Sequence, residues 1–274
     1  MRHSIRVLSL AIAAASLACG DHSPTSGIAT SDAPQRITNG TPTGTSYGNV
    51  GNVFVDEDGD GVWDWRCTGT LISGTVFLTA GHCYEPDATY YVTFAPVAFP
   101  APADLRTSDL ISSTTAYRHP DYLSPFDDIA VIILPADDVA ELGITPMPLA
   151  AEGYLTELRS EPAWGKKTAT VVGYGLASYG QGSYITQNDA VRRYAELKML
   201  SLDAYQLILH NNAPKAGQPG VCYGDSGGPV IVDGYLVAVA SYVGLDLGCH
   251  SLSGFSRVDT ESALGFLDDY VTIE

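Results

Sequence analysis

Short apolar runs separated by turn residues recur along most of this chain, and they limit what it can fold into. Each run has three to six residues and is rich in Val, Ile and Thr, which is typical of strands and too short for most helices. The clearest runs cover residues 50–55, 68–72, 76–80, 90–94, 130–134, 171–174, 230–232 and 235–240. The 28 Gly and 16 Pro favour tight turns between them. We therefore expect an all-β domain.

Two local signals refine this expectation. Asp233-Gly234 lies between two apolar runs and predicts a hairpin, because a two-residue hairpin turn requires positive φ angles. Residues 260–271 predict a helix, since Leu264, Leu267 and Val271 are spaced to form one buried face. No other segment indicates a helix, and no internal repeat is visible, although two diverged all-β halves fit the pattern.

Composition and charge narrow the classes of function. The chain has 274 residues, 45% of them hydrophobic, which suits one sizeable globular domain. Against 14 Lys and Arg stand 31 Asp and Glu, so the formal charge is −17. A field of this sign repels phosphate backbones and anionic lipid heads. We therefore expect no nucleic-acid partner.

The first residues resemble an export signal. Two arginines precede an apolar run over residues 7–18, which is too short to span a hydrocarbon core of ~30 Å as a helix. Residues 1–18 are therefore predicted to be a signal peptide, with no membrane span. A cut after Ala18 would give a freely secreted protein. The residues up to Cys19 also resemble a bacterial lipoprotein box, which would place an acylated Cys19 in the cell envelope. The sequence leaves both fates open.

Residues 19–36 contain mainly Ser, Thr, Gly, Pro and Asp, so we expect a flexible leader that buries no core. Export carries the remaining cysteines to an oxidising compartment, where an even number favours disulfides. These cysteines are Cys67, Cys83, Cys222 and Cys249, and three pairings are open to them. A zinc site is the alternative, but no Cys-x-x-Cys spacing supports it.

Three segments carry the residue types of nucleophilic catalysis. They contain His82 within 79–83, Asp128 within 127–131, and Ser226 within Gly-Asp-Ser-Gly-Gly-Pro. A serine hydroxyl is a poor nucleophile unless an imidazole accepts its proton, and the imidazole needs a carboxylate to fix its tautomer. Glycines beside Ser226 allow a turn that directs consecutive N–H groups at one oxyanion. Each segment alone has a structural reading as a turn, a core histidine or a cap.

Taken together, the segments resemble the trypsin/chymotrypsin-like serine endopeptidases in order, local motif and approximate spacing, over residues 37–274. The resemblance implies two packed six-stranded antiparallel β-barrels, covering roughly 37–145 and 146–274, with a C-terminal helix. It also implies a monomer that acts on proteins or peptides and needs no cofactor for catalysis.

The resemblance assigns roles to particular residues. His82 would be the general base and acid, Asp128 its orienting partner and Ser226 the nucleophile. The N–H groups of Gly224 and Ser226 would form the oxyanion hole.

Two nearby residues have no catalytic role in this interpretation. Asp127 would be the solvent-side neighbour of Asp128, because Asp128 directly precedes the apolar strand; an alignment shifted by one residue would exchange the two. His119 lies in a segment that resembles the family's approach to the catalytic aspartate.

The resemblance also selects among the cysteine pairings. It implies Cys67–Cys83, which would fix His82, and Cys222–Cys249, which would fix the walls of the substrate pocket. A third bridge common in the family has no cysteines here.

Activation by cleavage is the next implication. Arg36-Ile37 resembles the family's zymogen cleavage site, although Thr38 and Asn39 depart from its usual Val-Gly. An activating protease would free an ammonium on Ile37, which would pair with the buried carboxylate of Asp225 and order the oxyanion hole. Otherwise Arg36 is an ordinary leader residue.

Alignment on the family's anchors also implies a substrate pocket. Its residues would be Gly220, Ser241, Tyr242, Val243 and Gly254. Gly220 would stand where trypsins carry Asp, so cleavage after Lys or Arg is not expected. The branched Val243 would block large aromatic side chains while Gly254 keeps the other wall open, which favours small or medium aliphatic residues. Asp246 lies in a nearby loop and is an alternative source of charge.

An acidic segment predicts a structural calcium ion. Asp56, Asp58, Asp60 and Asp64 alternate with other residues as in the first half of a calcium loop. The expected Glu at the twelfth position is missing, and Cys67 stands there. The alternative is an acidic hairpin loop.

Two other functions compete with peptide hydrolysis. One is a catalytically silent relative that binds proteins through the same cleft, which the intact His82, Asp128 and Ser226 argue against. The other is a calcium-dependent adhesin, which rests on the acidic segment alone.

Overall fold

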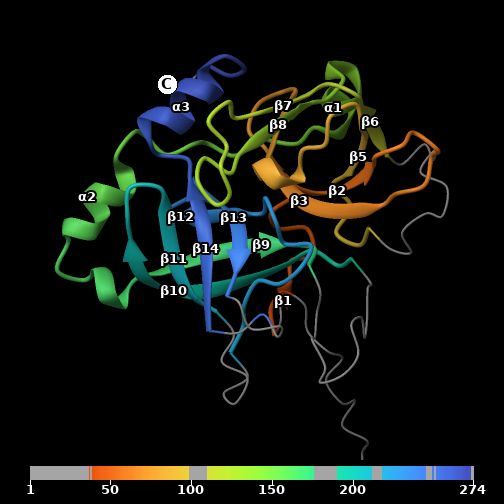
Figure 1. Cartoon of the computed structure of the whole chain (residues 1–274). Coiled ribbons are helices and arrows are strands. Elements are labelled where there is room, and N and C mark those ends of the chain that lie inside the picture. Colours follow the sequence, from red (N-terminus) through yellow and green to blue (C-terminus); the bar gives the residue numbers. More distant parts are fainter. Residues whose placement is uncertain are drawn as a thin grey trace, which may run out of the picture. The chain divides into compact units, whose positions relative to one another are not determined.

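Two antiparallel sheets of seven strands each organise the described part of the chain (Figure 1). This computed structural model describes residues 37, 39–98, 110–175, 190–211, 218–244, 249 and 251–272. They belong to one unit that spans residues 34–274. The export segment, Cys19, Arg36 and Asp246 lie outside the described residues.

The first sheet has the strand order β6-β5-β2-β3-β4-β8-β7. Its strands are β2 (Val50–Asp56), β3 (Trp65–Leu71), β4 (Val76–Thr79), β5 (Thr89–Thr93), β6 (Ile111–Ser113), β7 (Ala116–Arg118) and β8 (Ala130–Ile133). Every residue of β2 is buried, so this strand lies in the core.

The second sheet has the order β1-β10-β11-β14-β13-β12-β9, and β9 also pairs with β10, which closes β9 to β14 into a barrel. Its strands are β1 (Thr41–Pro42), β9 (Thr168–Gly173), β10 (Arg193–Leu202), β11 (Gln206–Asn211), β12 (Pro229–Val232), β13 (Tyr235–Val243) and β14 (Ser251–Arg257). The short β1 pairs with β10, although it precedes the first sheet in the sequence.

The predicted strands are present, and the fold expectation of two barrel-like antiparallel sheets is confirmed. All the predicted apolar runs overlap strands. The predicted hairpin joins β12 to β13, with φ angles of 51° at Asp233 and 88° at Gly234. Each sheet has seven strands instead of the expected six, because short edge strands are added.

The helices differ from the prediction in number. Helix α3 (Glu261–Asp268) is present at the C-terminal end, and its N-cap Thr260 accepts a hydrogen bond from the Ala263 N–H. Two helices were not predicted, α1 (Ala136–Leu142) and α2 (Tyr154–Ser160). Each has only seven residues and buries one or two of them, so neither produces a clear periodic pattern. Single 3₁₀ turns occur at η1 (Gly81–Cys83) and η2 (Trp164–Lys166).

None of the helices in the described ranges is long and apolar enough to cross a membrane.

A buried arginine ties the two sheets together. Arg192, which is 1% exposed, donates hydrogen bonds of 2.9 Å to the carbonyl oxygens of both Val50 and Phe94. Tyr174, at the end of β9, donates from its hydroxyl to the Ala95 carbonyl at 2.8 Å. These bonds run from residues next to β9 and β10 to residues in or next to β2 and β5, so they hold the two sheets in one relative position.

The loop before β12 lies directly on β3 and β4. Gly227 has a φ of 78°, and a Cβ atom there would be 2.1 Å from Thr79 Oγ1 and 2.4 Å from the Thr68 carbonyl oxygen. These distances are far below van der Waals contact. Only glycine therefore permits this approach of the second sheet's loop to the first sheet.

Gly227→Ala should destabilise the protein much more than Gly234→Ala. Both glycines have positive φ, but a Cβ at Gly234 would have no atom within 4 Å. We expect Gly234→Ala to cost about 1 kcal/mol from backbone strain alone, and Gly227→Ala at least about 3 kcal/mol more, because the clash is with backbone. Urea unfolding midpoints measure both. Equal losses for the two variants would contradict the close packing.

Candidate active site

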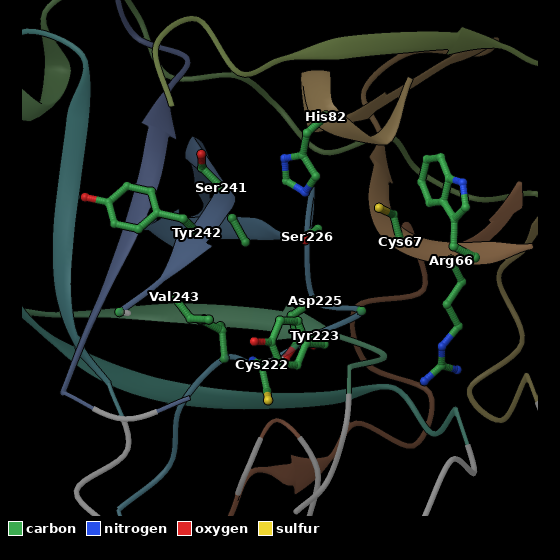
Figure 2. Close-up of a pocket in the computed structure, with 15 residues that line it drawn as sticks. Arg66, Cys67, His82, Cys222, Tyr223, Asp225, Ser226, Ser241, Tyr242 and Val243 are labelled. Atoms are coloured by element: carbon green, nitrogen blue, oxygen red, sulfur yellow. Dashed lines mark hydrogen bonds between the residues drawn. The ribbon is translucent and has the colours of Figure 1, made fainter. Parts of the chain in front are cut away.

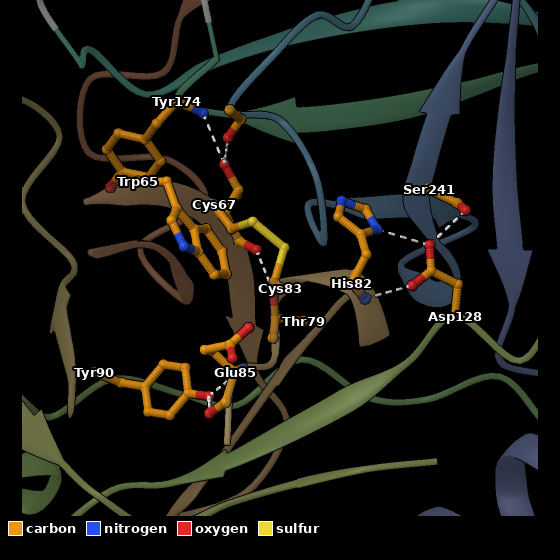
Figure 3. Close-up of a disulfide and its surroundings, with 12 residues drawn as sticks. Trp65, Cys67, Thr79, His82, Cys83, Glu85, Tyr90, Asp128, Tyr174 and Ser241 are labelled. Atoms are coloured by element: carbon orange, nitrogen blue, oxygen red, sulfur yellow. Dashed lines mark hydrogen bonds and ion pairs between the residues drawn. A yellow bond between two sulfur atoms is a disulfide. The ribbon is translucent and has the colours of Figure 1, made fainter. Parts of the chain in front are cut away.

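The disulfide Cys67–Cys83 joins β3 to the 3₁₀ turn η1 that carries His82 (Figure 3). A second disulfide joins Cys222 to Cys249. These are the two pairings that the resemblance implied. All four cysteines are oxidised, so they offer no thiolate for the alternative zinc site.

His82 and Asp128 are in direct contact. Asp128 Oδ2 lies 2.8 Å from His82 Nδ1, and Asp128 Oδ1 accepts a hydrogen bond from the His82 backbone N–H at 2.7 Å. The Asp128 side chain is 1% exposed and the imidazole 32%. Because an ionised carboxylate only accepts hydrogen bonds, Nδ1 carries a proton in this contact. The arrangement therefore leaves Nε2, the ring nitrogen that does not contact the carboxylate, to exchange a proton with another group.

Residues of β13 and β14 complete the surroundings of Asp128. The Ser241 hydroxyl donates to Asp128 Oδ2 at 2.6 Å, and the Asp128 N–H donates to Ser256 Oγ at 3.1 Å. Asp127 is only partly buried, and the contacts with His82 are made by Asp128, so the structure places Asp128, not Asp127, against the imidazole. The buried carboxylate is thus held by groups from both sheets.

His119 lies away from this contact. It is 4% exposed, its Nδ1 accepts the Asp121 N–H at 3.2 Å, and its Nε2 lies 3.2 Å from the Ser262 carbonyl oxygen. Its ring contacts Phe266 of α3. Its place is structural, between β7 and α3.

The loop that carries Ser226 is attached to β3. The Thr68 N–H donates to the Ser226 carbonyl at 2.8 Å, and the Thr68 hydroxyl donates to the Gly224 carbonyl at 2.8 Å. Gly224 has a φ of 93°. Within the described ranges, the N–H groups of Gly224 and Ser226 donate no backbone hydrogen bond. Two donors are therefore available beside the Ser226 hydroxyl.

His82 and Ser226 line one cavity of about 730 Å³. In Figure 2 the imidazole points toward Ser226, and no hydrogen bond joins these two side chains in the structure. Contacts of this kind often shorten only when substrate is bound. The other residues that line the cavity are Trp65, Arg66, Cys67, Val221, Cys222, Tyr223, Gly224, Asp225, Ala240, Ser241, Tyr242, Val243 and Gly244.

The structure brings Ser241, Tyr242 and Val243 to the cavity, as expected from the sequence, but not Gly220 or Gly254. A Cβ at Gly254 would lie 2.0 Å from Tyr242 Cε1. The missing side chain at Gly254 therefore makes room for the Tyr242 ring and does not widen a pocket wall. Val221 and Cys222, which forms the disulfide with Cys249, line the cavity instead.

Three residues at the site were missed by sequence reasoning. Thr68 and Arg66 are inside a strand, where their pattern resembles any other β segment, and Ser256 gave no signal at all. A contact between two sheets has no local sequence signature, so only the fold brings them together.

Asp225 is a buried carboxylate. It is 1% exposed, and its two oxygens accept the N–H groups of Gly175 at 2.7 Å and Cys222 at 2.8 Å. Burial raises the pKa of Asp225 to about 7, against the opposing effects of these hydrogen bonds and of the nearby Arg66 cation. Within the described residues Asp225 forms no ion pair.

The acidic segment forms the loop between β2 and β3. Carboxylate oxygens of Asp56, Asp58 and Asp64 lie within 4.8 Å of one another, and Asp60 is not part of that group. Both oxygens of Asp56 already accept backbone N–H groups, from Gly59 at 2.8 Å and from Gly61 at 3.0 Å. Oxygen ligands at this spacing suit calcium, but the hydrogen bonds also account for the loop without an ion. Calcium binding here stays a prediction.

Comparisons with known proteins agree with this geometry. The Trypsin family model matches residues 38–260. Brachyurin of Leptuca pugilator is 31% identical over 222 residues, which are 78% of this chain and 89% of brachyurin. The venom serine protease Bi-VSP of Bombus ignitus is 27% identical over 223 residues, which are 76% of this chain but only 59% of that protease.

Solved structures share the fold. HL collagenase superposes with a TM-score of 0.62 at 20% identity, covering 86% of this chain and 99% of the collagenase. A mutant of human heparin binding protein has a TM-score of 0.57 at 17% identity, covering 85% of this chain and 95% of that protein. With the family model matched over most of the chain, with His82 and Ser226 lining one cavity and with Asp128 bonded to His82, this chain belongs to the trypsin family of serine endopeptidases.

Proposed function

We propose that this chain hydrolyses peptide bonds through an acyl-enzyme formed on Ser226. The observation that carries the proposal is the contact of buried Asp128 with His82 Nδ1, because His82 lines the same cavity as Ser226 and Gly224, whose N–H groups donate no backbone hydrogen bond within the described ranges. In this arrangement the base, the nucleophile and the oxyanion donors serve one reacting carbonyl.

The chemistry follows the general Ser-His-Asp mechanism. His82 Nε2 accepts the Ser226 proton as Oγ attacks the scissile carbonyl carbon, and Asp128 stabilises the resulting imidazolium. The Gly224 and Ser226 N–H groups bind the oxyanion. His82 then protonates the leaving amine, and the C–N bond breaks. Water, deprotonated by His82, releases the acyl group by the same steps in reverse order.

Ser226→Ala should lower kcat/KM on a casein-type substrate by at least about 10⁴-fold, because no other group supplies the nucleophile. A fluorophosphonate should label the parent chain and not the variant. The matched control is Ser160→Ala, since Ser160 is exposed on α2 and its hydroxyl bonds only within that helix. Absence of both hydrolysis and labelling in the parent, after limited cleavage at Arg36, would favour the silent protein-binding relative.

We propose a preference for small or medium aliphatic residues before the scissile bond. Val221 and Val243 give the cavity apolar walls near Ser226. Among the described lining residues the one carboxylate is Asp225, and both its oxygens are occupied by backbone N–H groups. A basic side chain therefore finds no exposed carboxylate to pair with on these residues.

Val243→Gly should raise kcat/KM for a Phe substrate relative to an Ala substrate by about tenfold, because removal of a branched side chain opens the cavity by a few methylene groups. Peptides that differ only in Ala, Val, Leu, Phe or Arg before the scissile bond measure this preference. Arg as the best residue for the parent enzyme would contradict the proposal.

We propose that the chain is made as a zymogen cut after Arg36. Ile37 is fully buried in the core of the second sheet, so its backbone already lies inside the protein. Asp225 is buried and has no ion-pair partner among the described residues. An ammonium on Ile37 would supply the missing charge and order the neighbouring N–H groups of the oxyanion hole.

The uncleaved chain should lose stability as pH rises from about 4 to about 7, because the folded-state pKa of Asp225, about 7, lies above the ordinary value of 3.8. Over this interval the folded chain holds a proton that the unfolded chain releases, so the free energy of unfolding falls. Urea unfolding of the uncleaved Ser226→Ala chain, with and without Asp225→Asn, measures how much Asp225 contributes to the pH dependence of the free energy of unfolding. The pH dependence should be weaker in the chain that carries Asp225→Asn, because the amide does not titrate, and equal curves would refute the raised pKa.

Export, an activating protease and a monomeric state complete the proposal. Relatives named venom proteases support export. Whether Cys19 is acylated stays a prediction.

A further inference from the structure

Arg66 lines the cavity on the other side of Ser226 from Val243 (Figure 2). It lies on β3 next to Cys67 and lines the same cavity as His82 and Ser226. In Figure 2, Tyr242 and Val243 lie on one side of Ser226, and Cys67 and Arg66 lie on the other. His82 apart, Arg66 is the one basic side chain among the described residues that line the cavity.

The guanidinium of Arg66 has unused hydrogen-bond donors. Its Nη1 is buried without a partner, and within the described ranges the group forms no ion pair. The guanidinium packs against the loop that carries Gly224 and Ser226, since a Cβ at Gly224 would lie 3.6 Å from Arg66 Nε and 3.7 Å from Arg66 Nη2. A buried donor that lacks an acceptor costs free energy, which an incoming acceptor would recover.

The group remains a cation at neutral pH. Burial lowers the pKa of Arg66 to about 10, and attraction to Asp225 opposes this effect. Asp225 does not satisfy the unused donors, because no ion pair joins it to Arg66 within the described ranges and Nη1 is left without a partner. A carboxylate from outside the protein is therefore the fitting partner, since carboxylates match the planar guanidinium.

The direction of a bound peptide decides which part of it meets Arg66. In the proposed function the part of the substrate before the scissile bond would lie against Val243 of β13. The part after the scissile bond would then leave on the other side of Ser226, where Figure 2 shows Cys67 and Arg66. A side chain one or two residues after the scissile bond is then the group that reaches the guanidinium.

We propose that Arg66 selects substrates with an acidic residue at the first or second position after the scissile bond. This inference rests on the proposed peptidase function. It specifies which residues the enzyme prefers after the scissile bond. It also concerns a different side of the cavity from Val243, so the two preferences are independent.

Internally quenched peptides with one acyl sequence and Glu, Gln or Lys after the scissile bond test the proposal on the full chain after cleavage at Arg36. We expect Glu to exceed Gln in kcat/KM by about tenfold, as for a charge-assisted hydrogen bond in a partly buried site. The Glu-to-Gln ratio should fall toward one in Arg66→Gln and remain partly in Arg66→Lys. Arg66→Glu should prefer the Lys peptide.

The matched control is Arg118→Gln. Arg118 stacks over the rings of Tyr84 and Tyr122 outside this cavity, so its loss should leave the Glu-to-Gln ratio unchanged. Raising the salt concentration should reduce the preference for Glu in the parent, since screening weakens a partly exposed pair.

Three outcomes overturn the inference. Equal hydrolysis of the Glu and Gln peptides by the parent refutes it and leaves the peptidase function intact. A loss in Arg66→Gln that is the same for all peptides means that Arg66 only supports the Gly224 loop. If the parent hydrolyses none of the peptides or casein, the proposed function fails and this inference with it.

Discussion

The attachment of the Ser226 loop to Thr68 is the contact on which the rest of the site depends. Thr68 belongs to the first sheet, and it donates from both its backbone N–H and its hydroxyl to the loop of the second sheet. Its hydroxyl also accepts the Tyr174 N–H at 3.1 Å, and its carbonyl accepts the Thr79 hydroxyl at 2.8 Å. One residue thus fixes the nucleophile loop relative to the strand that leads to His82, and the distance between base and nucleophile follows from it.

Two buried aspartates serve this site in different ways. Asp128 accepts hydrogen bonds from the His82 backbone N–H and from the Ser241 hydroxyl, and the imidazole is its third partner. These three contacts stabilise the buried carboxylate. Asp225 receives two backbone N–H groups, yet burial still raises its pKa to about 7. The first is suited to a constant role in orienting a base. The second is poised to respond to a new positive charge, because its ionisation is unfavourable until one arrives.

The sequence predicts features that depend on neighbouring residues better than features that depend on residues far apart in the chain. Apolar runs and the Asp233-Gly234 turn are local, so the strands that contain them were predicted with little error. Strand β10 was missed because its exposed positions carry Glu196 and Lys198, which interrupt any continuous run, although its buried positions alternate with them. An alternating pattern of apolar and polar residues is harder to recognise than a continuous apolar run. It is nevertheless the pattern expected for a strand with one face on the core and the other in solvent.

Within the site, residues in motifs were found and residues that act across the sheets were not. His82, Asp128 and Ser226 stand in short, specific strings, which is why their meeting could be expected. Gly254 was placed on a pocket wall, whereas the structure uses its missing side chain to seat the ring of Tyr242. The error has a physical cause, because a glycine in a strand makes space equally well for a ligand and for a neighbouring side chain.

The two sides of the cavity come from different sheets, and this separates their chemistry. Val243 belongs to β13 of the second sheet, and Arg66 to β3 of the first. The Ser226 loop lies between these strands, bonded to β3 at Thr68 and to β13 at Ala240, so a change of side chain on one side need not disturb the other. Asp128 and His82 require burial and fixed hydrogen bonds from both sheets, while the walls require only shape and charge. The catalytic contact is therefore the part that the fold constrains, and the walls are the part that sequence change can adapt to a substrate.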